Sequence, residues 1–131
     1  MDALSQRIDA LESLGDYFSN FDENNPEYSP FVKAIKKATL ENGWFRREEC
    51  IHAISCWGKA LEKLNIEKWL APYALTENQS TKTIALVLAG NLPMVGFHDI
   101  LAVWITGNTA LIKCASKDKV LIPFIINNNP Q

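Results

Sequence analysis

The chain has 131 residues, of which 47% are hydrophobic and 21% charged, and its formal net charge at pH 7 is -2. This balance is typical of a folded globular protein, and it excludes the strongly basic surface on which most nucleic-acid binders depend. The longest apolar run, residues 84–89, is too short to cross a bilayer, so we expect no membrane span.

The N-terminal residues and the cysteines both indicate a cytoplasmic protein. Residues 1–14 lack the basic start and the unbroken apolar centre of a signal peptide. Cys50, Cys56 and Cys114 form an odd set without CxxC spacing, which is typical of reduced thiols rather than of a disulfide framework or a zinc site. We therefore also expect no metal centre.

Helical periodicity dominates residues 1–76. Apolar residues recur there at three- and four-residue intervals, first in the stripe formed by Leu4, Ile8, Leu11, Leu14 and Phe18. Ser29 followed by Pro30 predicts the start of a second helix, with the serine hydroxyl as its cap. A third helix is expected over residues 47–64, and a short fourth helix should end before Pro72.

The pattern changes in residues 77–131. Residues 83–89 are nearly all apolar and predict a strand buried on both faces of a parallel sheet. A tight turn follows, and Pro93 is expected at the first position of a helix that ends near Gly107. Residues 109–113 predict a second short strand, with a further helix beyond it. Strand, helix and strand in this order form a βαβ unit.

We therefore predict an α/β fold in two parts. Residues 1–76 form a helical N-terminal region, and residues 77–131 form the start of a Rossmann-like cofactor-binding domain. A doubly wound sheet has several strands with helices on both faces, so one βαβ unit leaves this domain incomplete. Two explanations stay open: the chain is a fragment, or an open sheet edge is completed by another copy in a homo-oligomer.

The turn after the first strand is the segment best suited to bind a ligand. In open α/β sheets, ligands lie beyond the C-terminal ends of the strands, where Gly90 and Asn91 are expected. A helix that starts at Pro93 would direct its free amides and the positive end of its dipole to the same place. The Asn91 amide can hydrogen-bond a developing oxyanion, but asparagine here can also be an ordinary helix cap.

Two segments resemble the aldehyde dehydrogenase superfamily. Residues 84–93 are an apolar strand that leads to an Asn-x-Pro turn, and residues 107–113 read Gly-Asn-Thr, a short strand and a lysine. Three further motifs are more particularly similar to the long-chain acyl-CoA reductases, relatives of the fatty-acid reductase of bacterial luminescence. They are Gly-Trp-Phe at 43–45, Ser-Cys-Trp-x-Lys at 55–59 and Gly-Phe-His-Asp at 96–99.

This resemblance implies an aldehyde-dehydrogenase-like fold that reduces an acyl-CoA, a fatty acyl thioester, to an aldehyde with NADPH. Asn91 matches the turn asparagine that helps to stabilise the oxyanion. Lys113 matches a lysine that contacts the adenosine ribose of the cofactor or its phosphate, although an ordinary exposed lysine is an equal alternative. Gly90, in the same turn, is a second candidate for cofactor binding. The sequence departs from many relatives directly after Lys113, where Cys114-Ala115 stands in place of Pro-Ser.

The nucleophilic cysteine of that family lies farther along the chain in relatives and has no counterpart among the three cysteines here. We therefore expect this chain alone to be inactive. Cys50 and Cys56 are predicted to be buried, inert thiols, because His52 lies two residues from Cys50 and points elsewhere on a helix. His98 and Asp99 could form a pair, but neighbours on a helix rarely face each other.

The leading hypothesis is thus the N-terminal part of an NADPH-dependent acyl-CoA reductase. The alternative is a non-enzymatic interaction or assembly module, because an unfinished sheet has an open strand edge that invites pairing.

Overall fold

The computed structural model describes residues 3–43, 45–75, 81–90, 92–115 and 118–127. Over these residues the protein is a mixed α/β fold, mostly helical, with a small parallel sheet of two strands. None of the described helices is long and apolar enough to cross a membrane. The elements are α1 (Ala3–Ser19), the 3-10 helix η1 (Pro26–Tyr28), α2 (Ser29–Glu41), α3 (Arg47–Ala60), α4 (Lys63–Leu70), β1 (Thr83–Val87), α5 (Phe97–Ile105), β2 (Thr109–Lys113) and α6 (Leu121–Asn127).

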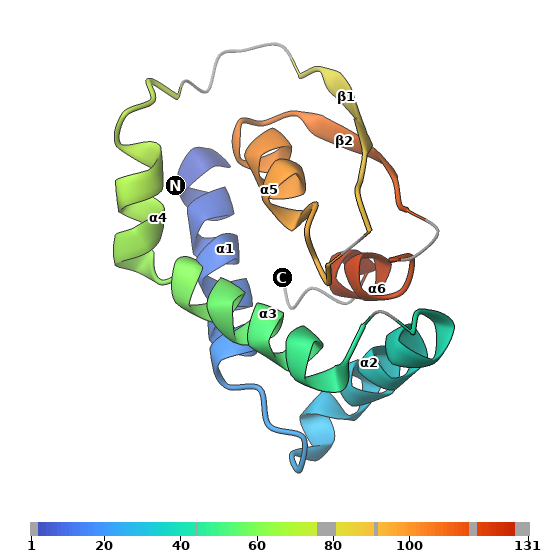
Figure 1. The fold of residues 1–131 in the computed structure, drawn as a ribbon. Coiled ribbons are helices and arrows are strands. Elements are labelled where there is room, and N and C mark those ends of the chain that lie inside the picture. The colour runs from blue at the N-terminus through green and yellow to red at the C-terminus, as the bar shows by residue number, and fades with distance from the viewer. Residues whose placement is uncertain (1–2, 44, 76–80, 91, 116–117, 128–131) are drawn as a thin grey trace.

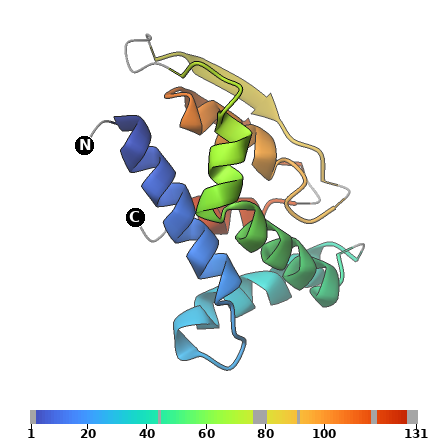
Figure 2. The same cartoon turned by 90° about the vertical axis from the view of Figure 1, so that its left-hand side faces the viewer.

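The elements are arranged in layers, as Figures 1 and 2 show from two directions. Helices α1 to α4 form one side of the molecule, and the sheet lies on the other side. Helix α5 lies between them and contacts α1 as well as both strands, whereas α6 packs against α2. The βαβ unit is therefore attached to the helical region through its crossover helix α5 and through α6.

Aromatic side chains join the two regions. Phe97, the first residue of α5, is only 1% exposed. Its ring meets Phe18 of α1 and Trp57 of α3 edge-on, with centroid distances of 6.2 and 5.0 Å. Phe31 of α2 stacks on Phe124 of α6 at 5.1 Å. One buried cluster thus draws on both predicted regions, while their predicted boundary at residue 76 lies outside the described residues.

Helices α1 and α3 approach closely because glycines lie at their contact points. A methyl group at Gly15 would lie 2.7 Å from the Leu61 Cβ and 2.9 Å from the Leu61 carbonyl oxygen. A methyl group at Gly58 would lie 2.6 Å from the Ser19 Oγ. These distances are shorter than van der Waals contact, so a larger side chain would push the helices apart.

The start of α2 differs from the prediction. Ser29 does not cap this helix, because α2 follows directly on η1 and its first flanking residue, Tyr28, makes no side-chain cap. The cap belongs to η1 instead: the Asn25 side chain accepts a hydrogen bond from the Glu27 amide at 3.0 Å. Pro30 lies in the first turn of α2, as predicted.

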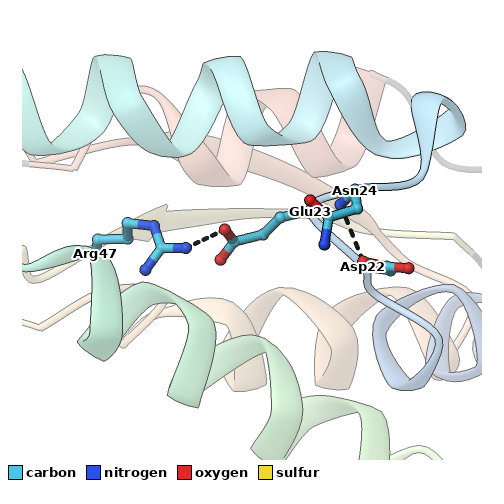
Figure 3. A network of polar contacts seen from close by, with 4 residues as sticks. All are labelled: Asp22, Glu23, Asn24 and Arg47. Atoms are coloured by element: carbon cyan, nitrogen blue, oxygen red, sulfur yellow. Dashed lines mark hydrogen bonds and ion pairs between the residues drawn. The ribbon is translucent and has the colours of Figure 1, made fainter.

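The loop between α1 and α2 also contacts the start of α3 (Figure 3). The Arg47 guanidinium forms an ion pair with the Glu23 carboxylate. Within the loop, the backbone N–H of Asn24 donates a hydrogen bond to the Asp22 Oδ1 at 2.9 Å. Because both ionic side chains are partly exposed, we expect this pair to contribute at most about 1 kcal/mol to stability.

The third helix, predicted over residues 47–64, ends earlier than expected. Helix α3 ends at Ala60, and Leu61 leaves the helical conformation with φ -95° and ψ 13°. Leu61 is buried against α1. Tertiary packing at this residue therefore turns the chain, and α4 begins at Lys63.

The two strands pair in parallel, as the βαβ prediction requires, and Val87 aligns with Lys113. Strand β1 ends at Val87, and side chains along both strands alternate between exposed and half-buried. Val87 is 81% exposed and Leu111 64%. The prediction that the first strand is buried on both faces is therefore wrong. In the described part of the chain, helices cover only one face of this sheet.

We expect Gly15→Ala to lower the free energy of unfolding by roughly 1–2 kcal/mol. The added methyl group overpacks the α1–α3 contact, and the better helix propensity of alanine offsets only part of that cost. Urea titration followed by circular dichroism measures the change. Gly43→Ala is the control, because no atom lies within 4 Å of the added methyl group and the effect should be close to zero. Equal stability of both variants would contradict this account of the helix contact.

Candidate functional site

The parallel register brings the C-terminal ends of both strands to one edge of the sheet. Val87 pairs with Lys113, and the Leu88 amide extends the ladder by donating to the Lys113 carbonyl oxygen at 3.0 Å. Gly90 follows β1 by three residues, so its segment leaves the sheet at the edge where β2 ends with Lys113. Asn91 lies outside the described residues, and its role stays a prediction.

Lys113 has the chemistry that an anionic ligand needs. Its side chain is exposed, and no ion pair joins its ammonium group to another described residue. Gly90 is half-buried and has no side chain to obstruct a ligand. An exposed ammonium group of this kind can serve as a point charge for an anionic group such as a phosphate.

The helix after the turn begins later than predicted. Pro93 lies in a turn, and α5 begins at Phe97, with Gly96 as the flanking residue. A methyl group at Gly96 would lie 2.6 Å from a terminal methyl group of Leu88, so glycine allows the helix start to pack on the end of β1. The predicted helix start at Pro93 is wrong because this packing, and not the proline, determines where the helix begins.

A buried carboxylate that no sequence pattern indicated holds the turn before α5. Asp118 is 3% exposed, and its Oδ2 accepts a hydrogen bond from the Met94 amide at 3.1 Å. Met94 has a positive φ of 60°, which is uncommon outside glycine. A turn amide that an anionic ligand could have used is therefore already bound to a carboxylate. Asp118 joins this turn to the segment that enters α6.

Burial raises the pKa of the Asp118 carboxyl above its ordinary value of 3.8. The backbone amides of Met94 and Leu121 lower it in part, because they stabilise the ionised form. The second carboxylate oxygen, Oδ1, is buried without a hydrogen-bond partner among the described residues. The ionised carboxylate is thus incompletely satisfied, which favours the protonated form in the folded chain.

The cysteines differ from the prediction in one respect. Cys50 is fully buried, and burial, with smaller contributions from Asp118 and Glu49, raises the pKa of its thiol to about 11. Cys56 is exposed on α3, so the prediction that it is buried is wrong. Its Sγ lies 3.4 Å from the His52 Nε2. The four-residue spacing that places two side chains on one helix face was the signal for this pair.

His98 and Asp99 do not form a catalytic pair with a fixed geometry. The His98 Nδ1 lies 3.9 Å from the Asp99 Oδ1, and both side chains are more than half exposed. The His98 ring is near Trp69 of α4, at a centroid distance of 5.5 Å. Among the described residues, no group of three or more His, Cys, Asp or Glu side chains could hold a metal ion.

Comparison with known proteins found no matching protein-family model, no matching curated protein and no matching solved structure.

We expect the stability of the chain to depend on pH through Asp118. The folded chain binds the Asp118 proton more tightly than the unfolded chain does. The stability that this proton contributes is therefore fully present below about pH 3.8 and is lost as the pH rises through the folded pKa. Asp118→Asn should remove this loss of stability with rising pH, because the asparagine side chain does not titrate. Its oxygen can still accept a hydrogen bond from the Met94 backbone amide. Urea titrations across pH 3 to 8 measure the free energy of unfolding of both chains.

The control for Asp118 is Asp9→Asn, which removes an exposed carboxyl on α1. Its stability should follow the pH profile of the unmodified chain. If the profile of Asp118→Asn also ran parallel to that of the unmodified chain, Asp118 would not be the group responsible.

The three cysteines should react at clearly different rates with iodoacetamide at pH 8, as followed by mass spectrometry. Cys56 should react first, because it is exposed on α3, with the His52 imidazole beside it. Cys50 should react last, since a thiol with a pKa of about 11 is ionised in roughly one molecule in a thousand at that pH. His52→Ala should slow Cys56 severalfold, whereas His98→Ala should not. Fast labelling of Cys50 in the folded chain would be incompatible with its burial.

Proposed function

We propose that this chain is the N-terminal part of an NADPH-dependent acyl-CoA reductase. In this proposal, its βαβ unit is the beginning of an aldehyde-dehydrogenase-like Rossmann domain that binds the cofactor. The supporting observation is the parallel pairing of β1 and β2, which brings the Gly90 segment and Lys113 to the same edge of the sheet. Ligands of open α/β sheets bind at this edge.

The exposed outer face of the sheet is consistent with this proposal. A doubly wound sheet is covered by helices on both faces, and its strands are nearly continuous in apolar residues. Here β1 has such a sequence, yet Val87 and Leu111 are mostly exposed. Apolar side chains of this kind fit a face that further elements of a larger domain would cover.

Each residue has a separate role in this proposal. Lys113 would hold the ribose or the phosphate of the cofactor by its charge, and Gly90 would let the backbone approach it closely. Asn91 would donate a hydrogen bond to the oxyanion that forms when a thiolate attacks the acyl carbonyl. NADPH, when bound, supplies the hydride that reduces the enzyme-bound thioester. The thiolate would come from a part of the enzyme that this chain does not contain.

A second candidate function is an interaction or assembly module. The exposure of Val87 and Leu111 on the outer face of the sheet also favours this function, because apolar side chains beside an open strand edge can pair with another protein. Sedimentation of the pure chain distinguishes the two functions when it is combined with the kinetic test below. If the chain is an interaction module, we expect it to self-associate, and we expect its parent protein to reduce no thioester.

The kinetic test uses the longest open reading frame that contains this sequence, expressed with its natural continuation. We expect acyl-CoA-dependent oxidation of NADPH, measured by absorbance, and none from the 131-residue chain alone. Asn91→Ala should lower kcat by roughly 10²–10³, the usual effect of removing an oxyanion donor. Lys113→Ala should raise the KM for NADPH by about tenfold with little change in kcat.

Lys82→Ala is the matched control, since Lys82 is an exposed lysine at the opposite end of the sheet. It should leave both kinetic constants unchanged. A reading frame that continues without further βαβ units or a cysteine, or a parent protein without reductase activity, would contradict the proposal.

A further inference from the structure

A half-open cavity of about 560 Å³ lies beside β2 and extends along it from Gly107 to Ile112. Residues of α1, α5, β2 and the end of α6 line it. Its size is within the range of small-molecule sites, about 300 to 1,000 Å³. Its wall is largely apolar and includes Leu11, Leu14, Phe97, Leu101, Trp104 and Ile125.

One positive charge lies at the rim of this cavity. A methyl group at Gly107 would lie 3.3 Å from the Arg7 Nη2 and 3.5 Å from the Arg7 Nη1, so the guanidinium lies directly against the glycine backbone. Gly107 has a positive φ of 85°, which also favours glycine there. The contact with Arg7 and the positive φ therefore both favour glycine at residue 107, which leaves room for the Arg7 side chain.

The Arg7 guanidinium is an uncommitted charged group at this cavity. Within the described residues, its guanidinium makes no hydrogen bond or ion pair, although it is only partly exposed. Asn108, a polar residue that also lines the cavity, uses both polar atoms of its side chain. Its Oδ1 accepts from the Lys82 amide at 3.0 Å, and its Nδ2 donates to the Thr106 Oγ1 at 3.0 Å. A ligand would thus meet mainly apolar side chains together with the free Arg7 guanidinium.

We propose that this cavity binds a small carboxylate with an apolar body. The guanidinium presents two parallel N–H donors that match the two oxygens of a carboxylate. The apolar wall takes the remainder of the molecule out of water. This site does not depend on the proposed cofactor contacts, because neither Gly90 nor Lys113 lines the cavity and Arg7 lies beside Gly107, before the start of β2.

A purely structural role for Arg7 makes different predictions. Gly107 follows the end of α5, where a cation is favourable beside the negative end of the helix dipole. If Arg7 served only the dipole, its replacement would change stability but would not affect binding of any ligand. The binding experiment separates these two roles.

The test is calorimetric titration of the 131-residue chain with octanoate, 1-octanol and octylammonium. Octanoate should bind more tightly than octylammonium by at least about tenfold, because only the carboxylate matches the guanidinium. From butyrate to hexanoate to octanoate, the Kd should fall by roughly threefold to fourfold for each added methylene group. Amide shifts of Gly107 and Thr109 in an NMR titration would locate the site.

Variants of Arg7 decide whether the charge matters. Arg7→Gln should weaken the binding of octanoate by about tenfold and leave the affinity for 1-octanol unchanged. Arg7→Lys should keep most of the affinity for octanoate. Arg46→Gln, which removes an exposed arginine with only a 4.0 Å contact to Glu49, is the control. Circular dichroism verifies that each variant is folded. The proposal is overturned if octanoate fails to bind the folded chain, or if Arg7→Gln binds it as tightly as the unmodified chain.

Discussion

The position of Phe97 between α1 and α3 is the contact on which the architecture depends. It is the first residue of α5 and is buried against Phe18 and Trp57. Because α5 is also the crossover of the βαβ unit, this one side chain fixes the sheet relative to the helical region. Edge-on aromatic pairs of this kind are directional as well as apolar, so they constrain the orientation of α5 and not only its distance. Both ends of the sheet, with their two candidate sites, are positioned through this contact.

The same attachment explains why the sheet has two different faces. Helices α5 and α6 cover the inner face, where Leu86 and Ile112 pack around Leu88, Ile100 and Ile122. Nothing in the described part of the chain covers the outer face. A protein with an apolar strand sequence and a half-covered sheet is expected to use that face for further elements or for a partner. This is the physical basis that the two functional hypotheses share.

The sheet edge at the C-terminal ends of β1 and β2, where the cofactor is proposed to bind, has both favourable and unfavourable charges for a phosphate. Lys113 offers a positive charge at the end of β2, whereas Asp118 occupies the Met94 amide in the turn before α5. A carboxylate near a phosphate is unfavourable unless it is protonated, and burial does raise the pKa of Asp118. Holding the left-handed turn at Met94 and accepting a phosphate are therefore competing demands on this short segment. At the opposite end of the sheet, Arg7 meets no such competing carboxylate among the described residues.

Local sequence determined much of the secondary structure. The apolar stripe of α1, the proline in the first turn of α2, the strand at residues 109–113 and the βαβ order all follow from periodicity and turn residues, which act within a few positions of the chain. The parallel register of the strands then brought the C-terminal ends of β1 and β2 to one edge, as the general rule for parallel sheets requires. The resemblance to acyl-CoA reductases rests on sequence motifs alone, and the function that it implies stays a proposal.

Only the tertiary structure decided features that depend on residues distant in sequence. The break after Ala60 results from packing of Leu61 on Gly15, and α5 begins at Phe97 because Gly96 fits against Leu88. The Asp118 contact to Met94 and the cavity beside Arg7 join elements that periodicity treats separately. Sequence patterns report which face of an element is apolar. They do not report what lies opposite that face, and it is this opposite surface that determines burial, pKa and the shape of a binding site.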